Sequence, residues 1–198
     1  MTIAGEARAG RWRTVDIVVG AVLAVAFGAV FQVWNLLWAS TGPAFKALPP
    51  LQGFMYGVWL LPAVLVPLVI RRPGAALLGE GVAAVASVLF GAPWGLVIVV
   101  YGLLQGAAAE VIFGLGLYRR WGLPTALLAG AAAGAAATLL DLALYYPDWA
   151  TGFQALYAAL VIPSAAVIAG LGSWLLVRGL ARAGVLAPFP SGREQPEV

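Results

Sequence analysis

The stretch that decides the fold is VDIVVGAVLAVAFGAVFQVWNLLW, residues 15–38, in which Asp16 is the only charged residue. An α-helix rises about 1.5 Å per residue and the hydrocarbon core of a bilayer is about 30 Å thick, so about 20 mostly apolar residues cross it. The run also exceeds the roughly 7 to 15 apolar residues of a signal-peptide core. The stretch therefore predicts a membrane-spanning helix that the mature protein keeps.

The rest of the chain has the same character. Of its 198 residues, 63% are hydrophobic and 10% are charged, whereas about a quarter of the residues in soluble domains are charged. Apolar runs separated by short polar or Pro-containing segments predict an all-α membrane protein with six transmembrane helices, at about residues 15–38, 54–70, 74–90, 94–118, 124–146 and 153–177. This membrane domain, residues 15–182, lies between a cytoplasmic N-terminal segment, 1–14, and a disordered cytoplasmic tail, 183–198.

The basic residues predict the orientation of this domain, because Lys and Arg accumulate in short cytoplasmic loops. With the N-terminus inside and six crossings, only Lys46 lies outside. The cytoplasmic set is Arg8, Arg11, Arg13, Arg71, Arg72, Arg119, Arg120, Arg178, Arg182 and Arg193. Both termini are therefore expected in the cytoplasm.

Missing residue types exclude several functions. The chain has no Cys and no His, which excludes disulfides, zinc sites built from Cys or His, and Ser/His catalytic pairs. It also has no P-loop, so ATP-driven transport would need a separate ATPase subunit. The arginines form short clusters between apolar runs rather than a basic helix face, so we expect no nucleic-acid partner. We expect no enzyme activity and no cofactor.

Besides Asp16 at the start of the first helix, three acids lie within predicted helices: Glu80, Glu110 and Asp141. A charged carboxylate near the bilayer centre costs about 2.5 to 3.5 kcal/mol on insertion scales, so such residues face protein or a ligand. Glu110 follows Gly102 and Gly106 at intervals of four, which places it on a small-residue face. No Lys or Arg lies in these helices, so the acids are protonated, bonded to neighbouring helices, or available to a ligand with amine-like donors.

Neutral polar and aromatic residues in the outer half could complete a small-molecule site. Trp34 or Tyr145 could stack on a ring. The full predicted binding set is Trp34, Asn35, Glu80, Gln105, Glu110, Asp141, Tyr145, Gln154 and Tyr157. Other aromatic residues at the outer boundary are typical membrane anchors, although their number also permits an aromatic-lined pocket: Trp38, Tyr56, Trp59, Trp94, Tyr146 and Trp149.

In the first helix, Gly20, Ala24 and Gly28 recur at intervals of four. This pattern lets helices approach closely. It fits packing inside the bundle as well as a surface that docks another membrane protein.

Four segments carry a resemblance to a known family: RWRTVDIVVGAVLAVAFGAVFQVWNLLW at residues 11–38, PGAALLGE at 73–80, GAPWG at 91–95, and GLLQGAAAEVIFGLGLYRRWG at 102–122. They resemble the substrate-binding S-components of energy-coupling factor (ECF) transporters, and more narrowly the YkoE-type family linked to hydroxymethylpyrimidine, a thiamine precursor.

The resemblance implies a six-helix S-component in a prokaryotic plasma membrane. It would capture hydroxymethylpyrimidine or another thiamine-related compound from outside and associate with a transmembrane T-component and two ABC ATPases. It also implies that the loop at residues 39–51 is a gate, that Gly20, Ala24 and Gly28 dock the T-component, and that Glu110 contacts the pyrimidine.

A second hypothesis is a self-sufficient, proton-coupled secondary transporter in which Glu110 and Asp141 carry the proton. It predicts uptake driven by a pH gradient without partner subunits. An S-component instead binds its substrate and transports it only with its ATPases. An integral membrane enzyme is the weakest alternative, because the sequence shows no recognisable nucleophile, base or metal cluster.

Overall fold

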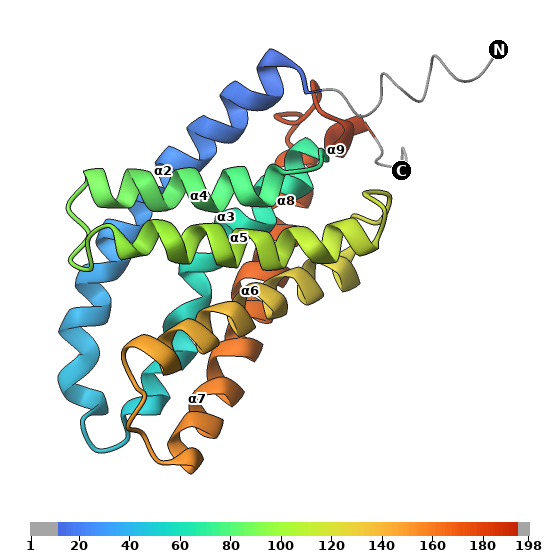
Figure 1. Cartoon of the computed structure of the whole chain (residues 1–198). Coiled ribbons are helices and arrows are strands. Elements are labelled where there is room, and N and C mark those ends of the chain that lie inside the picture. The colour runs from blue at the N-terminus through green and yellow to red at the C-terminus, as the bar shows by residue number, and fades with distance from the viewer. Residues whose placement is uncertain (1–11, 194–198) are drawn as a thin grey trace.

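The computed structural model describes residues 12–193, and within that range it is all-helical. The first element, α2 (Thr14–Thr41), continues through a short 3-10 turn, η1 (Gly42–Phe45). The next is a 3-10 helix, η2 (Pro49–Leu60), that runs directly into α3 (Leu61–Ile70). These segments form one antiparallel pair (Figure 1).

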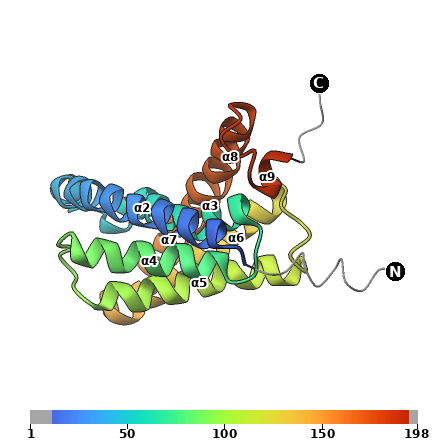
Figure 2. The ribbon, with the colours of Figure 1, turned by 90° about the horizontal axis from the view of Figure 1, so that it is seen from above.

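The remaining elements are α4 (Ala75–Leu89), α5 (Val97–Leu115), α6 (Leu123–Leu144), and a long final rod made of α7 (Thr151–Ser164), the π-helix η3 (Ala165–Leu171) and α8 (Gly172–Arg182). Helices α4 and α5 run side by side, and α8 stands on the opposite side of the molecule from α5 (Figures 1 and 2).

Five of the described helical segments are long and apolar enough to cross a membrane: Thr14–Phe45, Pro49–Ile70, Val97–Leu115, Leu123–Leu144 and Thr151–Arg182. The sixth apolar helix, α4, has 15 residues, which gives a length of about 22 Å and is short of the hydrocarbon thickness. The structure therefore supports a multi-pass helical protein, while six full crossings remain a prediction.

The segment Pro49–Ile70 forms the centre of the bundle. Its most apolar window is 78% buried, against 28% for Thr14–Phe45. Along α3 every residue from Pro62 to Ile70 is buried, so the core surrounds this helix on all sides. The exposed apolar side chains of α2, such as Val22 and Val33, instead face outward, as expected for a helix that touches lipid.

The predicted gate loop is mostly helical. Helix α2 extends to Thr41, η1 follows directly, and η2 already begins at Pro49, so residues 46–48 are the only part of the predicted loop outside a helix. The prediction of a loop at residues 39–51 is therefore wrong for most of the segment, while its role as a gate stays a prediction. Proline suits a first helical turn because that position needs no N–H donor, and a Pro pair here starts a helix rather than breaking one.

The prediction of a disordered C-terminal tail is also wrong for residues 183–193. Leu186 and Phe189 are buried against the core, and α9 (Pro190–Arg193) follows. The Ser191 hydroxyl donates to the Val69 carbonyl at 2.9 Å. Burial of these apolar side chains and this hydrogen bond offset the conformational entropy that the segment loses when it becomes ordered. The composition of the segment alone had suggested that it would stay disordered. Residues 194–198 of the predicted tail, and 1–11 of the predicted N-terminal segment, lie outside the described range.

Candidate functional site

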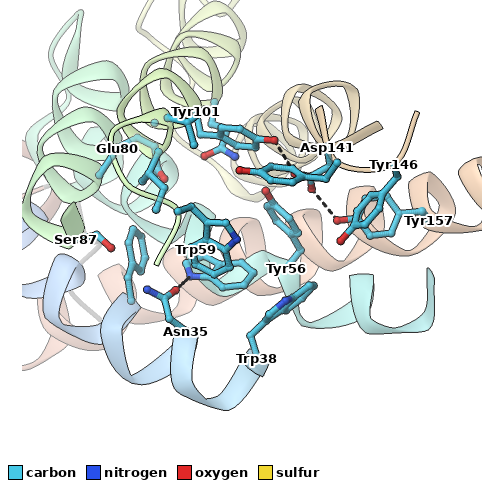
Figure 3. A pocket seen from close by; sticks show the side chains of 18 residues that line it. Asn35, Trp38, Tyr56, Trp59, Glu80, Ser87, Tyr101, Asp141, Tyr146 and Tyr157 are labelled. Carbon is cyan, nitrogen blue, oxygen red and sulfur yellow. Dashed lines mark hydrogen bonds between the residues drawn. The ribbon is translucent and has the colours of Figure 1, made fainter. Parts of the chain in front are cut away.

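A cavity of about 130 Å³ lies between α2, η2, α4, α5, α7 and the end of α6 (Figure 3). For scale, an apolar cavity of roughly 150 Å³ holds a benzene ring. The lining combines two acids, two amides, several hydroxyls and a wall of aromatic rings. The lining residues are Phe31, Asn35, Trp38, Tyr56, Trp59, Glu80, Ala84, Ser87, Trp94, Val97, Ile98, Tyr101, Gly102, Gln105, Asp141, Tyr145, Tyr146 and Tyr157.

Glu80 is held by a backbone donor on the central helix. Its Oε2 accepts a hydrogen bond from the Ala63 N–H at 2.9 Å, and the residue is only 2% exposed. Ala63 is the third residue of α3, where helical N–H groups have no partner within the helix. Within residues 12–193 no second donor reaches the carboxylate, so Oε1 remains available to a ligand in the cavity.

Asp141 lies at a different part of the cavity, among tyrosines. Its Oδ1 accepts from the Tyr101 hydroxyl at 2.8 Å and its Oδ2 from the Tyr157 hydroxyl at 2.7 Å. The Tyr56 hydroxyl points toward the same carboxylate (Figure 3). Asp141 therefore joins η2, α5, α6 and α7 through the phenol groups, which sets the positions of these rings in the wall.

A fourth tyrosine borders this cluster. Burial, followed by the charge of Asp141, raises the pKa of Tyr146 to about 12, so its hydroxyl is neutral at physiological pH. Its ring stacks on Trp149 with 4.0 Å between centroids. The aromatic wall thus presents neutral donors and π faces rather than additional charge.

The two amides of the cavity have different partners. Asn35 Oδ1 accepts a hydrogen bond from the Trp59 indole N–H at 2.9 Å, which fixes that ring. Gln105 is 4% exposed, Ser87 is 1% exposed, and neither side chain has a hydrogen-bond partner within the described residues. Buried polar groups are normally bonded, so these two side chains mark where a ligand would supply partners.

Trp59 is the centre of the aromatic wall. Its ring centroid lies 4.9 Å from Trp38, 5.2 Å from Tyr56 and 5.9 Å from Trp94. The Trp94 and Tyr56 contacts are edge-to-face, which is a favourable geometry for aromatic pairs. A ligand ring in the cavity can therefore contact both the faces and the edges of these aromatic side chains.

Six predicted binding residues come together in this cavity, and three do not. Those that line it are Asn35, Glu80, Gln105, Asp141, Tyr145 and Tyr157. The Trp34 indole N–H donates to the Met55 carbonyl at 3.1 Å and pins η2 to α2. The Gln154 amide lies 3.5 Å from the Pro147 carbonyl near the start of α7. Neither residue lines the cavity, because each side chain points to another neighbour, and their role in binding stays a prediction.

Glu110 is the most important correction. Its Oε1 accepts from the Gly74 N–H at 2.6 Å and its Oε2 from the Ala76 N–H at 2.8 Å. Both donors lie at the first turn of α4, where N–H groups lack helical partners and the helix dipole favours a negative charge. Glu110 therefore caps a helix instead of lining the cavity, and it is not brought together with Asp141.

The predicted docking face of α2 is also covered within the chain. Gly20, Ala24 and Gly28 are all buried. A side chain at Gly28 would lie 2.5 Å from the Ala86 Cβ, and one at Gly20 would lie 2.7 Å from the Ile70 Cδ1. These residues allow α3 and α4 to pack closely against α2. In this conformation these residues therefore pack inside the bundle, and docking of a T-component on this face stays a prediction.

Sequence reasoning missed Tyr101 and Ser87 as cavity residues, and it left Trp59 open between a membrane anchor and an aromatic-lined pocket. Tyr101 lies four residues before Gln105 and Ser87 lies seven after Glu80, spacings that place each pair on one helix face. That signal was available. The sequence could not decide the role of Trp59, because an aromatic residue that lines a pocket near the membrane boundary shows the same pattern as a membrane anchor.

The described residues contain no group of three or more acidic side chains that could hold a metal ion. The cavity can bind a small planar molecule that stacks on its aromatic rings. Glu80 can accept a hydrogen bond from such a molecule, and Gln105 and Ser87 can each donate or accept one.

Comparisons with known proteins agree with this picture. A family model described as the permease component of an ABC-type cobalt transport system matches residues 15–136. The chain is 31% identical over 188 residues to the "Putative HMP/thiamine permease protein YkoE" of Bacillus subtilis (strain 168), with 92% of each chain covered. A crystal structure of an S-component of an ECF transporter superposes with a TM-score of 0.88 at 30% identity, covering 93% of each chain.

Fold and site thus define the class: this is an S-component, the substrate-binding membrane subunit of an ECF transporter. Within that class, the chain belongs to the YkoE-type family. The prediction of an all-helical S-component fold is confirmed.

Proposed function

We propose that this chain captures hydroxymethylpyrimidine or another thiamine-related compound from outside the cell in the cavity lined by Glu80. The observation that carries the proposal is the available Oε1 of Glu80, beside a wall of aromatic rings. An aminopyrimidine offers an N–H donor to this oxygen and a flat ring to the wall. The name of the similar protein from Bacillus subtilis points to the same class of compound.

The proposal includes both termini in the cytoplasm and a cavity that opens outward. Helix directions support it: Arg13 precedes α2, Arg72 follows α3 and Arg119 follows α5, so these arginines share one end of the bundle. Asn35 and Asp141 lie toward the other end of their helices. With positive residues inside, the cavity is on the outer side.

The proposal also includes the partners of an S-component: a transmembrane T-component and two ABC ATPases. Purified chain in liposomes should bind the ligand without accumulating it, and accumulation should require the partners and ATP. Uptake by the chain alone under a pH gradient would instead support a proton-coupled secondary transporter.

The site itself is tested by Glu80→Gln in a titration of purified protein with hydroxymethylpyrimidine, followed by tryptophan fluorescence. An ordinary hydrogen bond contributes about 0.5–1.5 kcal/mol, so the Kd should rise by about 2- to 10-fold. Glu110→Gln is the matched control, since this acid caps α4 outside the cavity. Equal affinity of Glu80→Gln and the unchanged protein would remove Glu80 from the site.

A further inference from the structure

The carboxylate of Glu80 cannot recognise an aminopyrimidine edge by itself. Oε2 is already occupied by the Ala63 N–H, which leaves Oε1. One remaining oxygen can serve one of two adjacent ligand atoms, but not both. The edge of the ring carries an amino group, which donates, next to a ring nitrogen, which accepts. Oε1 can satisfy the amino group, but the ring nitrogen needs a donor from another residue.

Several donors of the cavity are already committed. The hydroxyls of Tyr101 and Tyr157 donate to Asp141, and the Trp59 indole N–H donates to Asn35. Ser87 has a free hydroxyl, but it lies seven residues along α4 from Glu80, about 10 Å at the helical rise. These groups are therefore not placed to donate to the ring nitrogen, which lies directly beside the amino group bound by Glu80.

Close packing of α5 against α4 places Gln105 near Glu80. A side chain at Gly106 would lie 3.1 Å from the Glu80 Cβ, and one at Gly102 would lie 2.9 Å from the Glu80 carbonyl oxygen. Gln105 lies one turn after Gly102 on the same face of α5, and both residues line the cavity. Its amide is 4% exposed and has no hydrogen-bond partner within residues 12–193.

We infer that Gln105 donates to the ring nitrogen beside the amino group, so that Glu80 and Gln105 together select heteroaromatic amines by their amino–imino edge. The inference rests on the proposed function and adds the substrate class and a specificity-determining residue. It also implies rejection of the corresponding oxo compounds, because a carbonyl group would face the Glu80 oxygen without a proton between them.

A chemical double-mutant cycle tests the pairing. Two ligands are titrated: 4-amino-5-hydroxymethyl-2-methylpyrimidine and its 3-deaza analogue, in which CH replaces the nitrogen next to the amino carbon. Each is measured with the unchanged protein and with Gln105→Met. The ratio of the two Kd values should change by about 5-fold or more between the two proteins. The comparison of ratios cancels the different basicity of the two ligands.

Gln154→Met is the matched control, because this glutamine lies outside the cavity lining, and its Kd ratio should equal that of the unchanged protein. An unaltered ratio in Gln105→Met would overturn the inference while leaving the proposed function intact. If the unchanged protein bound neither ligand, both the inference and the proposed function would be overturned.

A second measurement needs no variant. The unchanged protein should bind the 4-amino compound at least about 10-fold more tightly than the 4-oxo analogue. Equal affinities would also overturn the inference, even if Gln105→Met did not fold.

Discussion

The two ends of the bundle differ in how completely their buried polar groups are hydrogen-bonded. At the end where α2 begins, Asp16 is fully buried and accepts from Arg13 at 2.6 Å and from Arg72 at 3.3 Å. Glu110 there has a backbone donor on each oxygen. At the cavity end, Glu80 retains an oxygen and Gln105 retains its whole amide. Bonded polar groups hold helices together, whereas unpartnered ones indicate a ligand.

The cluster around Asp16 also ties three distant segments together. Arg13 reaches the Pro188 carbonyl at 3.4 Å, and the Trp12 indole N–H donates to the Pro73 carbonyl at 3.0 Å. The start of α2, the α3–α4 connection and the C-terminal segment therefore form one unit. We expect this end to determine stability and the cavity end to determine affinity.

Asp16→Ala should have the largest effect. Removing one partner of a buried ion pair costs about 3–5 kcal/mol, so the free energy of unfolding should fall by about that amount. Ligand affinity should change less than about 2-fold in the folded fraction. Unfolding in mixed detergent and a titration measure the two quantities. Asp148→Ala, at an exposed acid, should change stability by less than about 0.5 kcal/mol.

Glu110→Gln should lower the free energy of unfolding by about 1.5–3 kcal/mol, because the amide cannot accept both hydrogen bonds at the start of α4. The same unfolding measurement detects this loss. A variant with normal stability and abolished ligand binding would place Glu110 in the site and break the contrast between the two ends.

Asn35→Leu should act at the cavity end. It removes the acceptor for the Trp59 indole N–H, so the ring loses its fixed orientation. We expect the Kd to rise by about 2- to 10-fold, in line with a net hydrogen-bond contribution of about 0.5–1.5 kcal/mol. Gln154→Leu, at an amide outside the cavity lining, should leave the Kd unchanged. An unaffected Kd in Asn35→Leu would show that Trp59 needs no positioning.

Ser191→Ala should have the smallest effect. Loss of the hydrogen bond to the Val69 carbonyl should cost about 1 kcal/mol of stability, with no change in affinity. Faster proteolysis of the C-terminal segment would accompany it. A stability loss shared with weaker ligand binding would mean that the two ends are coupled.

Much of the site could be predicted from the sequence. Glu80, Gln105 and Asp141 are polar residues on small-residue faces of apolar helices, and polar side chains in such positions avoid lipid. Trp34 and Gln154 were predicted to join them but do not line the cavity. Periodicity identifies the face of a helix, but it does not say which neighbour that face meets.

The amino-acid sequence alone determined that this chain is an all-helical membrane protein whose buried acids face protein, because the bilayer penalises any other arrangement of such apolar runs. Only the tertiary structure decided which acid meets the cavity. Glu80 and Glu110 are similar in sequence context, yet one oxygen of Glu80 faces open space and both oxygens of Glu110 meet the first turn of α4. That difference arises from the packing of α3, α4 and α5, a property of contacts distant in sequence.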